Sequence, residues 1–187
     1  ADPTRLIPGR VVLDGDSVGV KEPDASLLFS EYVSGTGSDA ALEVFNASAT
    51  PAILRQDGFP GWMVLWLDQP NGTRDWANHA AVIPFPDGFR LPPYSTFVIA
   101  NPDADPSITG AASGLSAQLL TGGGAAVALA FDADGDGAYD PAVDALVDVI
   151  GDLSGVPGPE VFANTTLVRH GSVTAGATVF DAGEWTS

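Results

Sequence analysis

Five aspartates in one short segment carry the clearest chemical signal in the sequence. The segment F-D-A-D-G-D-G-A-Y-D-P-A-V-D covers residues 131–144, and its first three aspartates alternate with small residues before Gly137, which permits a sharp turn. Oxygen ligands at this spacing are typical of calcium loops, in which the seventh position contributes a backbone carbonyl. The spacing therefore predicts a structural Ca²⁺ site with ligands drawn from Asp132, Asp134, Asp136, the carbonyl of Ala138, Asp140 and Asp144.

Two features separate this segment from an EF-hand. The twelfth position is Val143, with Asp144 one residue later, and the flanking residues are typical of strands instead of helices. A solvated Asp/Gly turn that tolerates its own charge is the alternative interpretation. A magnesium-dependent catalytic cluster is disfavoured, because no His, Lys or Arg nearby offers a base or a phosphate clamp.

A second acidic pair, Glu31 and Glu43, lies within apolar runs. Buried carboxylate pairs can act as acid and base, but buried acids more often accept hydrogen bonds from backbone amides and pin a turn, which is the role we expect here. Strict alternation along residues 27–33 places Leu27, Phe29 and Glu31 on one face and Leu28, Ser30 and Tyr32 on the other.

The aromatic run W-M-V-L-W-L predicts core packing. Trp62 and Trp66 are four residues apart and share one face of a strand. With Trp76, which lies further along the same block, they could instead form an exposed platform for a carbohydrate.

Two common enzyme signatures, H-E-x-x-H and G-x-x-x-x-G-K-[ST], are missing, and the lack of cysteine excludes thiol nucleophiles, disulfides and cysteine-bound metals. We expect His79 in a strand and His170 to be exposed. Sequons begin at Asn46, Asn71 and Asn164, and their glycosylation depends on the host. We therefore predict no enzymatic activity.

The elements that must position these residues are strands. The chain has 22 Gly and 15 Pro between short β-branched or aromatic runs, which is typical of an all-β sandwich or barrel. One helical turn is expected at 105–108 or 111–115. We predict strands at 10–13, 17–20, 27–33, 41–46, 62–68, 77–85, 96–100, 125–131, 144–150 and 166–169.

Residues 1–24 form an extension ahead of the main block, residues 25–187. The extension contains R-V-V-L-D-G-D-S-V-G-V, in which Asp14-Gly15 is a typical hairpin turn. It is either the first hairpin of the sandwich or a segment that pairs with an exposed strand edge of a neighbouring copy.

From Ser26 onward the motif order resembles the lamin-tail domain family in its secreted bacterial form. The matching segments are L-L-F-S-E-Y-V (27–33), A-L-E-V-F-N (41–46), T-F-V-I-A-N (96–101), G-G-G-A-A-V-A-L (122–129), V-D-V-I-G-D (147–152) with Asp148 as its inner acid, and T-L-V-R with a closing F-x-x-x-E-W (165–185). Residues 62–85 are less typical, and nothing before Ser26 matches. The resemblance implies an immunoglobulin-like β-sandwich without a family-wide catalytic centre, used as an adaptor or surface module and often attached to secreted nucleases and other hydrolases.

The composition excludes several classes of partner. The chain has 7 Lys and Arg against 24 Asp and Glu, a formal charge of −17, so it lacks the basic clusters that bind nucleic acid, and anionic membranes would repel it. No apolar run approaches the ~18 residues of a membrane span. The chain begins Ala1-Asp2-Pro3 without an initiator Met, which predicts an extracellular or cell-surface protein after signal-peptide cleavage.

Together these features predict a non-enzymatic, exported structural or adhesive protein. Its most specific form is a subunit of a self-assembling surface filament that pairs through the extension. The alternative is an accessory module of a secreted hydrolase or nuclease system that binds a glycan or another ligand.

Overall fold

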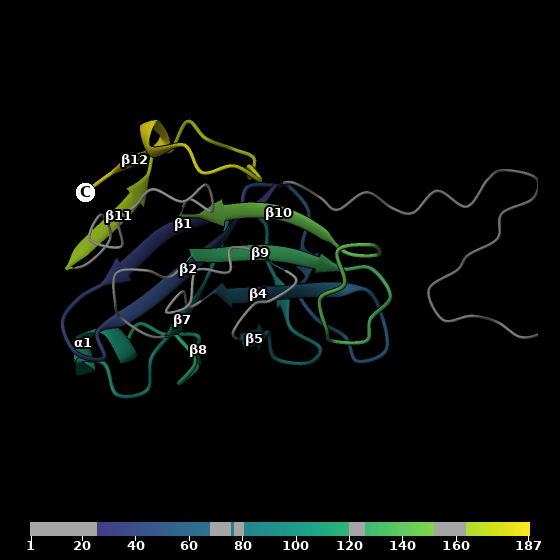
Figure 1. Cartoon of the computed structure of the whole chain (residues 1–187), viewed down its shortest axis with the longest axis horizontal. Coiled ribbons are helices and arrows are strands. Elements are labelled where there is room, and N and C mark those ends of the chain that lie inside the picture. The colour runs from purple at the N-terminus through teal and green to yellow at the C-terminus, as the bar shows by residue number, and fades with distance from the viewer. Residues whose placement is uncertain (1–25, 68–75, 77–80, 120–125, 152–163) are drawn as a thin grey trace, which may run out of the picture.

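Strand β1 (Leu27–Ser34) lies inside the larger of the two main sheets. A computed structural model describes residues 26–67, 76, 81–119, 126–151 and 164–187, and Figure 1 shows their arrangement. The larger sheet has six strands in the order β12-β11-β1-β2-β7-β8. Its other members are β2 (Ala40–Asn46), β7 (Thr96–Ala100), β8 (Gly114–Leu115), β11 (Thr165–Arg169) and β12 (Trp185–Thr186).

The second sheet has four strands in the order β10-β9-β4-β5. These are β10 (Ala145–Ile150), β9 (Ala126–Asp132), β4 (Gly61–Leu67) and β5 (Ala81–Pro84), and a separate small sheet joins β3 (Ala52–Ile53) to β6 (Arg90–Leu91). Their pairings are antiparallel, and within the described ladders only β7 and β8 run parallel. The protein is an all-β sandwich, as predicted.

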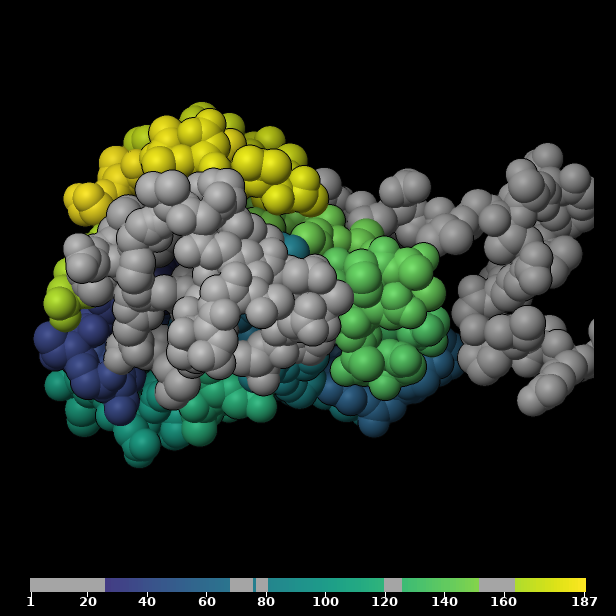
Figure 2. Space-filling view, in the orientation of Figure 1, coloured from purple at the N-terminus to yellow at the C-terminus, as the bar shows by residue number. Residues whose placement is uncertain are grey.

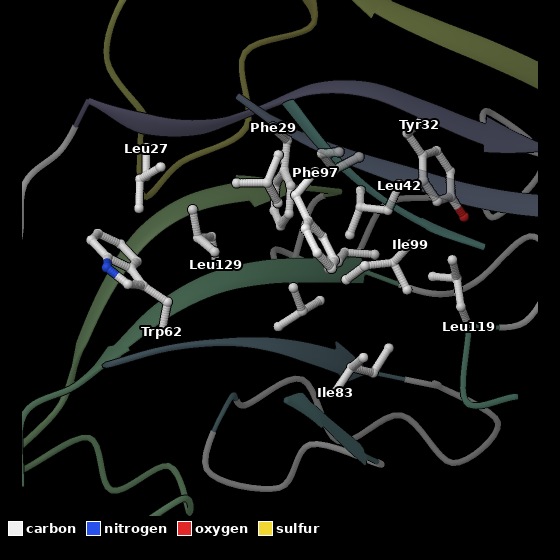
Figure 3. Close-up of a cluster of buried hydrophobic side chains, with 14 of the residues drawn as sticks. Leu27, Phe29, Tyr32, Leu42, Trp62, Ile83, Phe97, Ile99, Leu119 and Leu129 are labelled. Atoms are coloured by element: carbon white, nitrogen blue, oxygen red, sulfur yellow. The ribbon is translucent and has the colours of Figure 1, made fainter. Parts of the chain in front are cut away.

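The main core lies between the two sheets. Figure 3 shows side chains from both sheets converging there, including Phe29 and Leu42 from the larger sheet and Trp62 and Leu129 from the smaller one. Burying each large apolar side chain contributes about 1.5–3 kcal/mol, so this layer is the principal source of stability. Trp185 from the last strand belongs to the same cluster, which ties the C-terminal end to the sandwich.

Strands β4 and β9 are buried on both faces. Every residue of β4 is buried, with Trp62, Val64 and Trp66 in the main core and Met63 and Leu65 in a second cluster on the opposite face. The two tryptophans therefore share one face as predicted. Their exposed fractions of 6% and 3% confirm core packing and exclude a carbohydrate platform built from them.

The alternation predicted for β1 is wrong beyond Phe29. A register shift between Phe29 and Glu31 interrupts the pairing of β1 with β2, because a bulge adds one residue to one strand. Tyr32 therefore enters the main core beside Leu27 and Phe29, while Glu31 is half-buried and lines a cavity with Val33.

The other predicted strands within the described residues are present with small changes at their ends. The helical turn is α1 (Pro106–Thr109), where Asp105 caps the first turn by accepting from the Ser107 N–H at 2.8 Å. A short 3₁₀ helix, η3 (Ala182–Glu184), precedes β12. The predicted strands at 10–13 and 17–20, and residues 1–24 as a whole, lie outside the described residues. No described helix has the length and apolar character needed to cross a membrane.

Candidate functional sites

The acidic loop joins β9 to β10 and begins at Asp132, the last residue of β9. Asp132 is buried, and its two carboxylate oxygens accept the N–H of Gly135 at 2.6 Å and of Gly137 at 2.9 Å. Both glycines have positive φ, +76° and +81°, a conformation that side chains with a Cβ rarely adopt. The D-x-D-G-D-G spacing therefore builds a tight turn around one carboxylate.

The remaining aspartates of the loop also accept backbone amides. Asp144 accepts the N–H groups of Ala133 and Asp140, both at 2.8 Å, and so closes the loop at its base. Local bonds between residues two apart run to Asp134 from the Asp136 N–H, to Asp136 from the Ala138 N–H and to Asp140 from the Ala142 N–H.

The loop brings three of the six predicted ligands together. Oxygens of Asp132, Asp134 and Asp136 lie within 4.8 Å of one another, close enough to share one cation. Asp140 and Asp144 are joined to each other at the loop base and are not part of that described group. Burial raises the pKa of Asp132, the neighbouring Asp144 adds to this, and the two amide bonds act in the opposite direction.

The loop packs against the chain that leads into β4. A Cβ placed on Gly135 would lie 2.6–2.9 Å from backbone atoms of Phe59, so only glycine allows this approach. A cavity of about 50 Å³ beside the contact is lined by Asp132 and Asp136 and by Arg55 and Asp57 from the neighbouring segment. Figure 2 shows the loop, in green, at one end of the molecule above blue residues of that segment.

The second acidic pair lies on the outer face of the larger sheet. Glu31 and Glu43 are directly opposite across β1 and β2, and both are half-buried. Glu43 accepts the Ser30 hydroxyl at 2.6 Å, so neither the expected turn nor a deeply buried pair describes it. Burial raises the pKa of Glu31, and repulsion from Glu43 raises it further.

Two cavities adjoin at Glu43. One, of about 230 Å³, is lined by Glu31, Val33, Val98 and Ile108, and we name it the Val98 cavity. The other, of about 460 Å³, is lined by Leu28, Phe45, Tyr94 and His170, and we name it the Phe45 cavity. Glu43 lines both, so the two cavities adjoin at this residue, and we call the pair of cavities the sheet-face groove.

Tyr94 stands at the rim of this groove. It is 65% exposed, and its φ of +52° is a left-handed conformation that is uncommon for a residue with a large side chain. His170, also in the groove lining, is exposed as predicted. No sequence signal pointed to Tyr94, since an isolated tyrosine after two prolines has no pattern.

A buried ion-pair network joins the two sheets of the sandwich. Asp148 in β10 is fully buried and accepts from the Arg169 guanidinium, the Phe29 N–H and the Ala177 N–H. Arg169 also donates to Glu184 at 2.8 Å and to the Phe29 carbonyl at 3.0 Å, and it lies 4.8 Å from the Trp185 ring centroid. Burial opposes the charge of Arg169, but Asp148 and Glu184 outweigh it and raise the pKa. The guanidinium of Arg169 and the carboxylates of Asp148 and Glu184 are all partnered, so the role of the network is structural.

The three sequons have different positions. Asn46 is buried, and its amide donates to the carbonyls of Thr50, Leu91 and Pro92, so it anchors a turn. Asn164 is exposed with a φ of +54°. Asn71 lies outside the described residues, as do His79 and the pentapeptide G-D-S-V-G at 15–19, whose letters match the spacing of a hydrolase nucleophile elbow.

No family model, curated protein or solved structure matches this chain. The resemblance to lamin-tail domains and the immunoglobulin-like assignment therefore stay predictions.

Proposed function

We propose that this chain is a non-enzymatic, exported structural protein that self-associates through residues 1–24. The observation that carries the proposal is that the described strands share one core cluster. The core cluster runs from Leu27 in β1 to Trp185 in β12, and both strands are hydrogen-bonded to neighbours in the larger sheet. A sandwich of the lamin-tail type would need no more than these residues.

The extension supplies apolar side chains that require burial. They are Leu6, Ile7, Val11, Val12, Leu13, Val18 and Val20. If one copy buries them on the next, the contact joins two different surfaces and need not close into a ring. Such a contact propagates into a filament.

Three of the four described edges of the two main sheets offer little room for an added strand, and the fourth is the six-residue strand β10. The larger sheet ends in the two-residue strands β12 and β8, and β5, at one edge of the smaller sheet, ends at Pro84, which has no N–H to donate. This supports docking on a face of the neighbouring copy more than extension of one of these three edges.

The test is to delete residues 1–22 and compare the product with the full chain by light scattering and electron microscopy. Circular dichroism checks that the shortened chain folds. We expect filaments from the full chain and monomers from the deletion. A strictly monomeric full chain, or a folded deletion that assembles equally well, contradicts the proposal.

We further propose that the acidic loop binds one structural Ca²⁺ through Asp132, Asp134 and Asp136, with Asp140, Asp144 and the carbonyl of Ala138 as the outer set of candidate ligands. Support comes from the convergence of three carboxylates within 4.8 Å. Bound cation should stabilise the fold by about 2.7 kcal/mol at a hundredfold excess over Kd. Thermal melts with calcium and with chelator, at fixed ionic strength, measure this. Superimposable melts would leave the solvated-turn interpretation.

A second candidate function is binding of a glycan or similar ligand as an accessory module of a secreted hydrolase system. The exposed Tyr94 ring beside the Phe45 cavity favours it, because sugars stack on exposed aromatic faces. Retention on polysaccharide affinity gels, lost in Tyr94→Ala and kept in Phe59→Ala, would support this alternative. Phe59 is a suitable control because it is also exposed, at 48%.

A further inference from the structure

The sheet-face groove has apolar ends and an acidic centre. Val33, Val98 and Ile108 line the Val98 cavity, whereas Leu28 and Phe45 line the Phe45 cavity. Between them stand Glu31 and Glu43, paired across the two central strands. Along β1 the groove therefore alternates apolar, acidic, apolar.

The acidic centre lacks a basic partner within the described lining. Arg169 is the one cation there, and its guanidinium is already bound to Asp148 and Glu184. The raised pKa of Glu31 reflects the repulsion from Glu43 in addition to burial. A cation placed at the junction would relieve this repulsion and be partly desolvated by the cavity walls.

The extension contains a segment with the complementary order. Residues 5–13, R-L-I-P-G-R-V-V-L, hold two arginines and no acid, in a chain that has 7 basic residues in total. Arg10 stands between the apolar pair Leu6-Ile7 and the apolar run 11–13. The segment therefore alternates apolar, basic, apolar around Arg10.

We propose that residues 5–13 of one copy lie in the sheet-face groove of a neighbouring copy, with Arg10 between Glu31 and Glu43. Leu6 and Ile7 occupy one cavity and residues 11–13 occupy the other. This inference rests on the proposed self-association and names its acceptor surface.

The dimensions agree with this placement. An extended chain advances about 3.3 Å per residue, so Leu6 to Leu13 spans about 23 Å. The groove follows β1 from Leu28 to Val33, which covers about 17 Å at the same rise, and the outer residues of the segment extend just past both cavities. Pro8 has no N–H, which a face-docked segment needs less than a sheet-paired strand.

Two full-length variants separate the two halves of the contact. Arg10→Glu reverses the charge at the centre of the segment and leaves the groove unchanged. The double variant Glu31→Gln, Glu43→Gln removes the charge of the groove and leaves the segment unchanged. Arg90→Glu and Asp103→Asn are the matched controls, because both residues are exposed and outside the groove lining. Circular dichroism and thermal melts verify that each variant folds.

Light scattering and analytical ultracentrifugation give the concentration at which half the protein assembles. We expect each of the two variants to raise this concentration by about tenfold or more. In the double Gln variant the desolvated Arg10 meets no carboxylate, and in Arg10→Glu the new carboxylate meets Glu31 and Glu43. The controls should change it by less than threefold. A 1:1 mixture of the two variants should form a heterodimer and stop, because only one intact segment meets one intact groove.

Each other outcome overturns the inference. If the wild type assembles and the groove variants assemble equally well, the acceptor lies elsewhere and the proposed function stands. If both variants are monomeric and their mixture forms no heterodimer, the segment does not dock on a neighbouring copy. Docking of the segment in the groove of the same copy would give this result. A monomeric wild type overturns the inference and the proposed function together. Where the double variant Glu31→Gln, Glu43→Gln fails to fold, Arg10→Gln provides the same comparison from the segment side.

Discussion

At the scale of single residues, the buried ion pair of Asp148 and Arg169 is expected to contribute strongly to stability. Asp148 is fully buried and Arg169 is 7% exposed, so each charge depends on the other for compensation. Arg169→Leu would leave the carboxylate with only the Phe29 and Ala177 amides, and losing one partner of a buried ion pair costs about 3–5 kcal/mol. Urea unfolding followed by tryptophan fluorescence measures the loss.

The matched control is Arg55→Leu. Arg55 pairs with Asp57 at 2.9 Å, but the two side chains are 34% and 65% exposed, and such pairs contribute about 0–1 kcal/mol. Equal losses for the two variants would mean that burial does not set the strength of the Asp148 interaction.

Glu31 carries a pH-dependent contribution to stability. Because its pKa is raised in the folded state, folding favours its protonated form, and this contribution disappears as pH rises through the folded pKa. Glu31→Gln should therefore be more stable than the wild type at pH 7, by less than about 1 kcal/mol because solvent screens a half-buried charge. The advantage should vanish below the ordinary value of 4.5. Chemical denaturation at several pH values in dilute protein tests this, and an advantage that grows on acidification would contradict it.

At the scale of elements, the long strands were predictable and the short ones were not. Strand β4 follows from the run W-M-V-L-W-L, and β7 has the bounds predicted from T-F-V-I-A. Two-residue strands such as β3, β6 and β8 have no periodicity of their own, since only their partners define them. The bulge in β1 was also invisible, because one inserted residue leaves no mark of its own in so short a segment.

The two candidate sites also differ in how far the sequence predicts them. The acidic loop is local, so spacing alone placed Asp132, Asp134 and Asp136 together. The sheet-face groove joins β1, β2, β7 and the chain after β11, which approach only once the larger sheet has formed. A pattern in one segment of sequence does not predict such a surface.

The acidic loop offers a matched pair of glycines. Gly135→Ala combines a positive φ of +76° with a Cβ 2.6 Å from the Phe59 backbone, whereas Gly137→Ala has a positive φ of +81° and open space. We expect a loss of about 1–2 kcal/mol at Gly137 from backbone strain, and a further 1–3 kcal/mol or so at Gly135 from overpacking. Thermal denaturation of both variants measures the difference. Equal losses would show that the loop moves away from Phe59 at little cost.

At the scale of the whole molecule, charge is distributed unevenly. The formal charge is −17, and of the described basic residues Arg169 is enclosed by acids while Arg55 pairs with Asp57. Few acidic groups therefore have a basic partner among the described residues, and self-repulsion opposes the compact state. Within an assembly, the same repulsion would limit lateral bundling of filaments.

This self-repulsion predicts that monovalent salt stabilises the fold. The Debye length falls from ~10 Å at 0.1 M to ~3 Å at 1 M, so repulsion between exposed carboxylates is largely screened at the higher salt. We expect the melting temperature at pH 7 to rise with NaCl in dilute protein, with chelator present so that calcium does not contribute. Near the sequence pI of 4.1 the net charge is small, and the same salt series should give a much shallower slope. A melting temperature independent of NaCl at pH 7, or an equal slope at both pH values, would mean that the carboxylates are compensated locally, as Asp132 and Asp144 are by backbone amides, and that net charge does not limit stability.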